Sequence, residues 1–118
     1  MTERDVSERS WGRYEIVYQG PTENGYLKVK RLILNPLSST SKQRHKFRTE
    51  FFFPLLGEVK IRNEDWNDFA WPAYRITNST TVPPGVWHQL INETEKPASL
   101  IEVQVGAVVE EDDIERAG

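Results

Sequence analysis

The recurrence of short apolar segments between turn residues is the feature that most constrains the fold of this chain. Segments rich in β-branched and large apolar residues alternate with turns that contain Gly, Pro or Asn, at spacings of roughly 8–12 residues. They cover residues 13–19, 26–34, 49–62, 74–82, 86–93 and 98–109. No helical crossover separates them, so antiparallel pairing is expected. The pattern predicts an all-β sandwich or small barrel, with a short helix only in the tail 110–118.

The length and composition indicate one compact globular domain. The chain has 118 residues, 37% of them hydrophobic and 28% charged, which is enough for a single core. Residues 1–10 are polar, and we expect them to form a flexible N-terminus before a domain over 11–118. Trp11 and Tyr14 are expected to anchor the core or an interface, and residues 63–74 to form an aromatic, acidic loop.

Charge and cysteine content exclude several classes of protein. The net charge of −3 argues against a general nucleic-acid binder, which usually has a basic face. The absence of cysteine excludes disulfides, thiolate metal sites and cysteine nucleophiles. No apolar run approaches the roughly 18–20 residues of a membrane span, and the N-terminus lacks an apolar signal core. A cytoplasmic protein is therefore expected. Separately, exposed strand edges favour pairing of two chains into a homodimer.

The only two histidines of the chain occupy positions that suit a metal site. Gln43 and His45 are two residues apart and point to the same side of a strand. Glu50 follows after five residues, so a bend must lie between His45 and Glu50. His88 comes from another strand, after the turn Pro83–Gly85. A lone histidine in a strand is more often structural, but this mixed nitrogen and oxygen set suits Zn, Mn, Fe or Co.

Two spaced motifs in these segments resemble those of the cupin family. Glu50-x₆-Gly57 resembles the end of the first cupin motif, with Gln43 at the place of its first histidine. Pro83-x-Gly85-x₂-His88-x₃-Asn92 resembles the second motif, with Thr77 at the place of its leading glycine. This resemblance implies a double-stranded β-helix, that is, an antiparallel jelly-roll barrel.

Longer segments of the chain resemble one particular family of cupins. The chain is similar, over residues 9–116, to the cupin domain of type II mannose-6-phosphate isomerases, which often follows a mannose-1-phosphate guanylyltransferase domain. The similarity is carried by SWGRYEIV, YLKVKRLILNP, SKQRHKFRTE and SLIEVQVGAVVEEDDIER. It implies a metal-dependent isomerase that interconverts mannose 6-phosphate and fructose 6-phosphate. The implied cofactor is one divalent metal, Zn first and otherwise Mn, Co, Fe or Ni, on Gln43, His45, Glu50 and His88.

The resemblance also implies roles for cationic residues. Arg48 matches a family arginine and is expected to act in catalysis or to contact the substrate. It ends a local basic run in an otherwise acidic chain, which fits an anionic ligand. Lys28 and Lys30 share one strand face, which approaches the sugar phosphate or is simply solvated. In the first case Lys28 is a further catalytic candidate and Lys30 a substrate-binding one. Arg116 matches the terminal family arginine, with a substrate role or a packing role.

Some alternatives stay open at the level of sequence. Glu102 and Gln104 share one strand face: Glu102 is the candidate base if this face lines a cavity, but a solvent-facing position is slightly favoured. Phe47 replaces a family histidine, and Phe51-Phe52 replace His-Trp. The alternative function is therefore a non-catalytic or different-substrate cupin that binds a sugar or sugar nucleotide. A dioxygenase is less expected, because Gln43 removes one nitrogen ligand.

Overall fold

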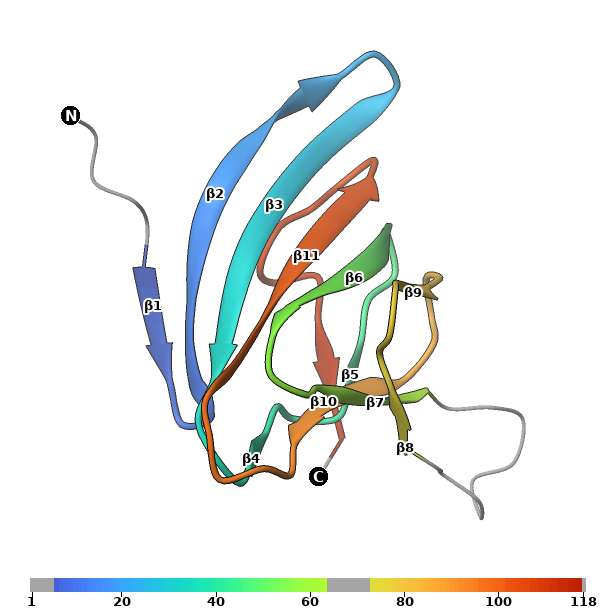
Figure 1. Cartoon of the computed structure of the whole chain (residues 1–118). Helices are drawn as coiled ribbons and strands as arrows, with labels where there is room; N and C mark the ends of the chain where they lie inside the picture. The colour runs from blue at the N-terminus through green and yellow to red at the C-terminus, as the bar shows by residue number, and fades with distance from the viewer. Residues whose placement is uncertain (1–5, 64–72, 118) are drawn as a thin grey trace, which may run out of the picture.

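The fold consists of antiparallel β-strands in two sheets (Figure 1). The computed structural model describes residues 6–63 and 73–117, and within these ranges it contains no helix. Every strand pair is antiparallel, which confirms the predicted all-β, antiparallel class. The aromatic, acidic loop expected at residues 63–74 falls mostly outside the described residues.

Both sheets have six strands, and the one with the longer strands is called the larger sheet. Its strand order is β1-β2-β3-β11-β6-β9. Its members are β1 (Val6–Arg9), β2 (Gly12–Thr22), β3 (Gly25–Leu34), β6 (Arg48–Leu56), β9 (Thr80–Val82) and β11 (Ala98–Gly106). The strands β3, β11 and β6 lie at its centre and are long, so their registers fix which side chains become neighbours.

The smaller sheet has the order β12-β5-β10-β7-β8, and β4 also pairs with β10. Its members are β4 (Ser38–Ser39), β5 (Gln43–Arg44), β7 (Lys60–Asn63), β8 (Ala73–Arg75), β10 (His88–Asn92) and β12 (Glu115–Arg116). The strands β5 and β10 each begin at a residue of the predicted metal site, Gln43 and His88.

The two chain ends differ from the sequence-based expectation. Val6–Arg9 were expected to belong to a flexible N-terminus, but they form β1 and pair with β2. Residues 1–5 lie outside the described residues, so flexibility there stays a prediction. The prediction of a short helix in the tail is wrong, because residues 115–116 form β12 against β5. A strand can form there because β5 offers an unpaired edge for backbone hydrogen bonds.

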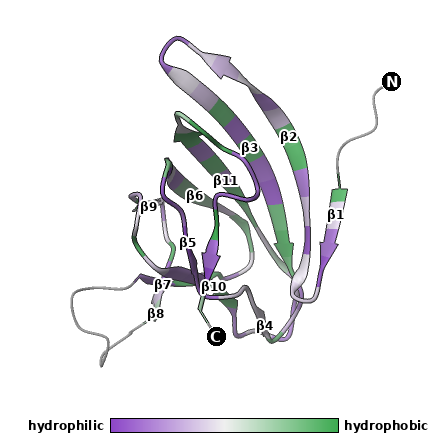
Figure 2. Cartoon of the chain, turned by 180° about the vertical axis from the view of Figure 1, so that it is seen from behind, coloured by the Kyte–Doolittle hydropathy of each residue, from purple (hydrophilic) through white to green (hydrophobic). Residues whose placement is uncertain are grey.

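The inward face of the larger sheet changes from apolar to polar along the strands. Leu32 and Leu100 are opposite each other in the register of β3 and β11, and both are buried. Further along the same strands the opposed pairs are Lys30 with Glu102 and Lys28 with Gln104, all buried as well. Figure 2 shows hydrophilic and hydrophobic residues alternating along β3 and β11. The barrel thus has an apolar core at one end and a polar interior at the other.

The apolar end holds the main core. It includes Tyr14, as the sequence predicted, with Trp11 packed against it. The other principal members are Leu32, Leu34, Phe52, Val59, Ile61, Ile76, Val82, Leu90 and Leu100. Among the described residues, nothing forms a helix with the length and apolar character of a membrane span.

Candidate metal centre

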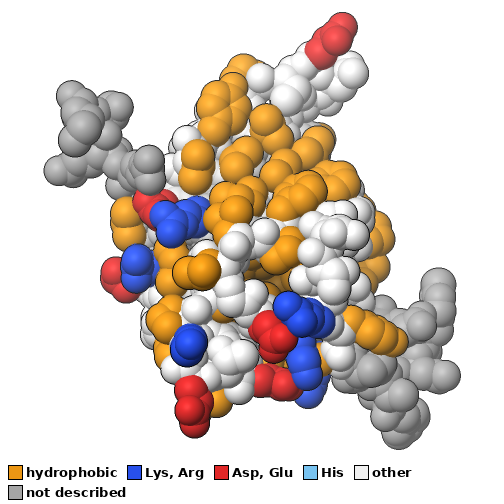
Figure 3. Space-filling view, in the orientation of Figure 1, with side chains coloured by type: hydrophobic (Ala, Val, Ile, Leu, Met, Phe, Trp, Pro, Cys, Tyr) orange, Lys and Arg blue, Asp and Glu red, His pale blue; other side chains and the backbone are white. Residues whose placement is uncertain are grey.

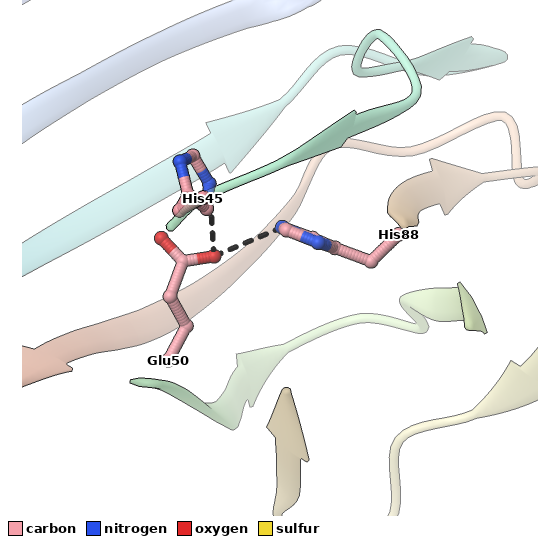
Figure 4. A group of neighbouring side chains, drawn as sticks. All are labelled: His45, Glu50 and His88. Carbon is pink, nitrogen blue, oxygen red and sulfur yellow. Dashed lines mark ion pairs between the residues drawn. The ribbon is translucent and has the colours of Figure 1, made fainter. Parts of the chain in front are cut away.

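Three side chains from different parts of the chain converge in the polar interior (Figure 4). His45 directly follows β5, Glu50 lies in β6, and His88 opens β10. The Oε1 atom of Glu50 lies 2.9 Å from Nε2 of His88 and 3.4 Å from Nε2 of His45. One ligand atom from each residue falls within 4.8 Å of the others. The predicted bend exists, because residues 45–47 separate β5 from β6.

Backbone carbonyls fix the tautomer of both imidazoles. Nδ1 of His45 lies 2.6 Å from the carbonyl oxygen of Asp113, and Nδ1 of His88 lies 3.1 Å from that of Val86. A carbonyl oxygen only accepts hydrogen bonds, so each Nδ1 must carry the proton and donate it. In the neutral imidazoles both Nε2 atoms are then lone-pair donors that face Glu50, which is the arrangement of metal-ligating histidines.

The Oε1 atom of Glu50, between the two imidazoles, lacks a partner of its own. It is buried and receives no hydrogen bond while both imidazoles are neutral. Burial by itself raises the pKa of Glu50, but His45 and His88 in their protonated forms donate hydrogen bonds and place positive charge beside the carboxylate, which outweighs burial and holds the pKa well below its ordinary value. Burial likewise lowers the pKa of His88, and Glu50 reverses this and raises it. A divalent cation satisfies all three groups at once, so the residues present fit a metal.

Arg48 contacts both Glu50 and His45. Its Nε donates to Oε2 of Glu50 at 3.1 Å, and its Nη1 donates to the carbonyl of Glu110 at 3.1 Å. Its Nη2 lies 3.2 Å from Nε2 of His45. Arg48 therefore occupies the second oxygen of Glu50 and leaves the first for a cation.

A turn joins the two halves of the site. Gly85, in the turn before β10, donates its backbone N–H to the carbonyl of His45 at 2.7 Å. Its φ of 83° lies in the left-handed region, which glycine adopts without steric cost. The turn thus fixes the position of His45 and the start of the strand that carries His88.

One cavity of about 230 Å³ brings together most of the predicted site residues. Its walls include the triad and five other predicted residues: Lys30, Gln43, Arg48, Glu102 and Arg116. Gln43 is opposite His88 in the register of β5 and β10. Lys28 lies outside this cavity, in the wall of a neighbouring hollow with Gln19 and Tyr26.

The favoured solvent-facing position of Glu102 and Gln104 is wrong. Both side chains are buried and line the cavity, and Gln104 donates from Nε2 to Oε1 of Glu102 at 2.6 Å. Burial raises the pKa of Glu102 and the charge of Glu50 adds to this, against the opposing charges of Lys30 and Arg48. A carboxyl with a raised pKa is suited to proton transfer near neutral pH.

The segment after β11 supplies two residues that the sequence reasoning did not single out. Asp113 accepts hydrogen bonds from the backbone N–H groups of Lys46 and Phe47, at 2.9 and 3.0 Å, besides its carbonyl contact to His45. Glu111 pairs with Lys28 and Lys30. The signal was present, because both residues lie in the stretch EEDDIER that carries the family resemblance. Within that stretch, the resemblance implied a role for Arg116 alone.

The phenylalanines that replace family residues change the cavity little. Phe47 is exposed and faces a separate surface hollow. Phe51 lies on the outer face of β6, since its neighbours Glu50 and Phe52 point inward. Phe52 lines the cavity, with its ring 6.1 Å from that of His88. An aromatic side chain therefore stands where the family has tryptophan.

Solved structures show the class of fold. The chain superposes on the capsular polysaccharide assembling protein CapF of Staphylococcus aureus with a TM-score of 0.81 and 16% identity, over 98% of this chain and 34% of CapF. A cupin-2 domain from Rhodospirillum rubrum gives a TM-score of 0.73 and 10% identity, over 98% and 76%. The fold is a cupin with a buried His-Glu-His group that can bind a metal.

The family within that class follows from the sequence comparisons. The model "Mannose-6-phosphate isomerase C-terminal" matches residues 2–118, and the chain belongs to this family. The chain is 34% identical over 110 residues to the xanthan biosynthesis protein XanB of Xanthomonas campestris pv. campestris, covering 92% of this chain. It is 32% identical over 110 residues, again 92% of the chain, to a mannose-1-phosphate guanylyltransferase of Klebsiella pneumoniae. The chain spans about a fifth of each relative (21%).

Proposed function

We propose that the chain is a metal-dependent aldose–ketose isomerase that interconverts mannose 6-phosphate and fructose 6-phosphate. The observation that carries this proposal is that the His45–Glu50–His88 group and the buried carboxyl of Glu102 line the same cavity. A cavity of about 230 Å³ is smaller than typical ligand pockets of about 300–1,000 Å³. It suits a monosaccharide better than a sugar nucleotide.

The reaction moves hydrogen between C1 and C2 of the sugar. Glu102 takes the proton from C2 and returns it to C1, while the hydroxyl proton of O2 passes to O1. Gln104 holds the carboxyl of Glu102 in place through its hydrogen bond. His45, Glu50 and His88, with Gln43 as a further ligand, would hold a divalent metal, which when bound would supply the electrophile for the substrate oxygens. Zn is the first choice, and Mn, Co, Fe and Ni are alternatives for this donor set.

The cations of the cavity recognise the anionic part of the substrate. Lys30 and Arg116 line the cavity, and Lys28 lies next to Lys30 on the inward face of β3. Arg48 is assigned to catalysis, because it orients Glu50 and His45 and also reaches the cavity. We expect the protein to act in the cytoplasm, without nucleic-acid or membrane partners.

The test is a coupled assay for fructose 6-phosphate with metal-loaded protein and mannose 6-phosphate. We expect turnover by the wild type and a loss of about 10²–10³-fold in Arg48→Ala, the size seen for lost electrostatic donors. Arg48→Lys keeps the charge but loses the planar fork, so it should recover only part of the rate. Equal turnover by Arg48→Ala would remove the role of Arg48.

The wild type itself tests the isomerase proposal. Metal-loaded protein that binds mannose 6-phosphate without turnover would point to the non-catalytic alternative. Neither turnover nor binding would point to a cupin for another substrate.

A further inference from the structure

Two buried lysines share one carboxylate at the side of the cavity. Oε1 of Glu111 lies 2.6 Å from Nζ of Lys30 and 3.3 Å from Nζ of Lys28. The lysine side chains are 6% and 8% exposed, whereas that of Glu111 is 48% exposed. The lysines come from β3, and Glu111 comes from the segment that runs across the inner side of the larger sheet to β12 (Figure 2).

The charges in this cluster are unequal. Lys28 and Lys30 carry two positive charges, and among the described residues one carboxylate, that of Glu111, lies within hydrogen-bond distance of them, since the nearby carboxyl of Glu102 is held by Gln104. Buried ammonium groups are costly unless they are paired, so the pair of lysines favours an anion with more than one charged oxygen. A phosphate group carries between one and two negative charges at neutral pH and three acceptor oxygens. It can therefore satisfy the two lysines better than a single carboxylate oxygen does.

The cluster adjoins the metal centre. Lys30 and Glu111 both line the cavity that holds His45, Glu50 and His88. The charge of Lys30 acts on Glu102, the neighbour of Lys30 in the register of β3 and β11. A ligand anion in the place of the Glu111 carboxylate would thus lie at the wall of the cavity that holds the metal centre, with Lys30 lining that cavity and Lys28 lining the neighbouring hollow.

We propose that Lys28 and Lys30 form a phosphate subsite, and that Glu111 occupies this subsite as an internal anion that the ligand phosphate displaces. This inference rests on the proposed function, because it places the phosphate of the substrate. Glu111 can leave without breaking the metal site, since its exposed side chain can turn toward water. The other anchors of its segment, Glu110 and Asp113, contact Arg48 and the loop after His45 through separate hydrogen bonds.

The experiment measures the affinity of the whole chain for inorganic phosphate by isothermal titration calorimetry. In Glu111→Gln the internal competitor is removed, and we expect phosphate to bind about tenfold tighter, which corresponds to about 1.4 kcal/mol. Asp112→Asn is the matched control. It removes one negative charge from the adjacent, exposed residue, and it should leave the affinity unchanged. Equal affinity in Glu111→Gln and Asp112→Asn would overturn the proposal.

A second variant separates the subsite from a general charge effect. Lys30→Met in the Glu111→Gln background should weaken phosphate binding at least tenfold, because one of the two cations is lost. Phosphate binding that survives in this double variant would place the anion elsewhere and overturn the proposal. Circular dichroism of each variant checks that it is folded.

The results for this subsite and for the isomerase are distinguishable. Tighter phosphate binding by Glu111→Gln without any isomerase turnover supports the subsite and contradicts the reaction. Turnover by the wild type with unchanged phosphate affinity in Glu111→Gln supports the reaction and contradicts the subsite.

Discussion

At the scale of single residues, the second cupin motif contains both a site residue and a structural residue. His88 faces Glu50, but Asn92, four residues later, ties the end of β3 to the turn after β10. Its Nδ2 donates to the carbonyls of Leu34, Asn35 and Lys96, at 3.2, 3.1 and 2.8 Å. Its Oδ1 accepts from the backbone N–H and the hydroxyl of Thr94. The motif therefore specifies the barrel as well as the site.

Asn92→Ala should destabilise the protein by about 2–3 kcal/mol. The substitution leaves buried carbonyl groups without donors, and each unsatisfied group costs about 1–3 kcal/mol before the structure relaxes. Urea unfolding measures the change, with Ser38→Ala as the control, because the half-buried Ser38 donates from its hydroxyl to the carbonyl of Pro36. A change below about 0.5 kcal/mol in Asn92→Ala would show that these hydrogen bonds are replaced by water.

Residue by residue, the sequence predicted the convergence of His45, Glu50 and His88 better than the positions of the other cavity residues. The spacing of His45 and Glu50 required a bend, and the bend is present. The prediction that Glu102 and Gln104 face solvent is wrong for a physical reason. The alternation of polar and apolar residues along a strand shows which residues share a face. It does not show which face points inward, and here the apolar face is not the inner one. The inner face of this sheet is polar around the cavity, and Ile101, Val103 and Val105 point outward.

At the scale of elements, the segment after β11 is the part that sequence patterns describe least. Its residues are mostly charged, and it has no periodicity that distinguishes helix from strand. Its conformation depends on contacts far away in the sequence: Glu111 with β3, Asp113 with the loop before β6, and β12 with β5. Only the tertiary structure shows that this stretch closes one side of the cavity.

The ion pairs of Glu111 predict a pH dependence of stability. Burial would raise the pKa of Glu111, but Lys30 and Lys28 outweigh it and lower the pKa below its ordinary value of 4.5. A lowered pKa contributes stability that is present above about pH 4.5 and is lost as the pH falls through the folded-state pKa. Because Glu111 is half exposed, the contribution should stay below about 1 kcal/mol.

The measurement compares wild type with Glu111→Gln by urea unfolding at pH 7 and in acid. The wild type should be the more stable at pH 7, and the difference should shrink as the pH falls below 4.5. A difference in stability that stays constant with pH would show that the carboxylate charge is not its cause.

At the scale of the whole molecule, the outer face of the larger sheet is apolar. Figure 3 shows hydrophobic side chains gathered over β3, β11 and β6. Phe53 and Val105 are exposed there, with Tyr18 exposed on β2. Arg31 and Glu15, which form an ion pair of 3.4 Å, lie on the same face. A face with an apolar centre and both signs of charge can match a second copy of itself about a twofold axis.

We therefore expect a homodimer through this face rather than through the strand edges that the sequence suggested. Light scattering after gel filtration should give the mass of two chains for the wild type and of one chain for Phe53→Lys. Leu37→Lys changes a more exposed apolar residue in the turn after β3 and should leave the dimer intact. A monomeric wild type, or a dimer that persists in Phe53→Lys, would contradict this interface.

The proposed activity depends on a metal held by His45, Glu50 and His88, and the metal content of the purified chain tests this centre directly. After loading with Zn and dialysis, elemental analysis should find one metal ion per chain in the wild type. His45→Ala, Glu50→Gln and His88→Ala should each reduce the affinity more than about 100-fold, since they remove ligands themselves and loss of a supporting residue already costs about 10–100-fold. Binding should also weaken below about pH 6, because imidazole ligates only in its neutral form. The absence of stoichiometric Zn, Mn, Co, Fe or Ni from the wild type, or binding by the three variants as tight as that of the wild type, would contradict a metal centre at these residues.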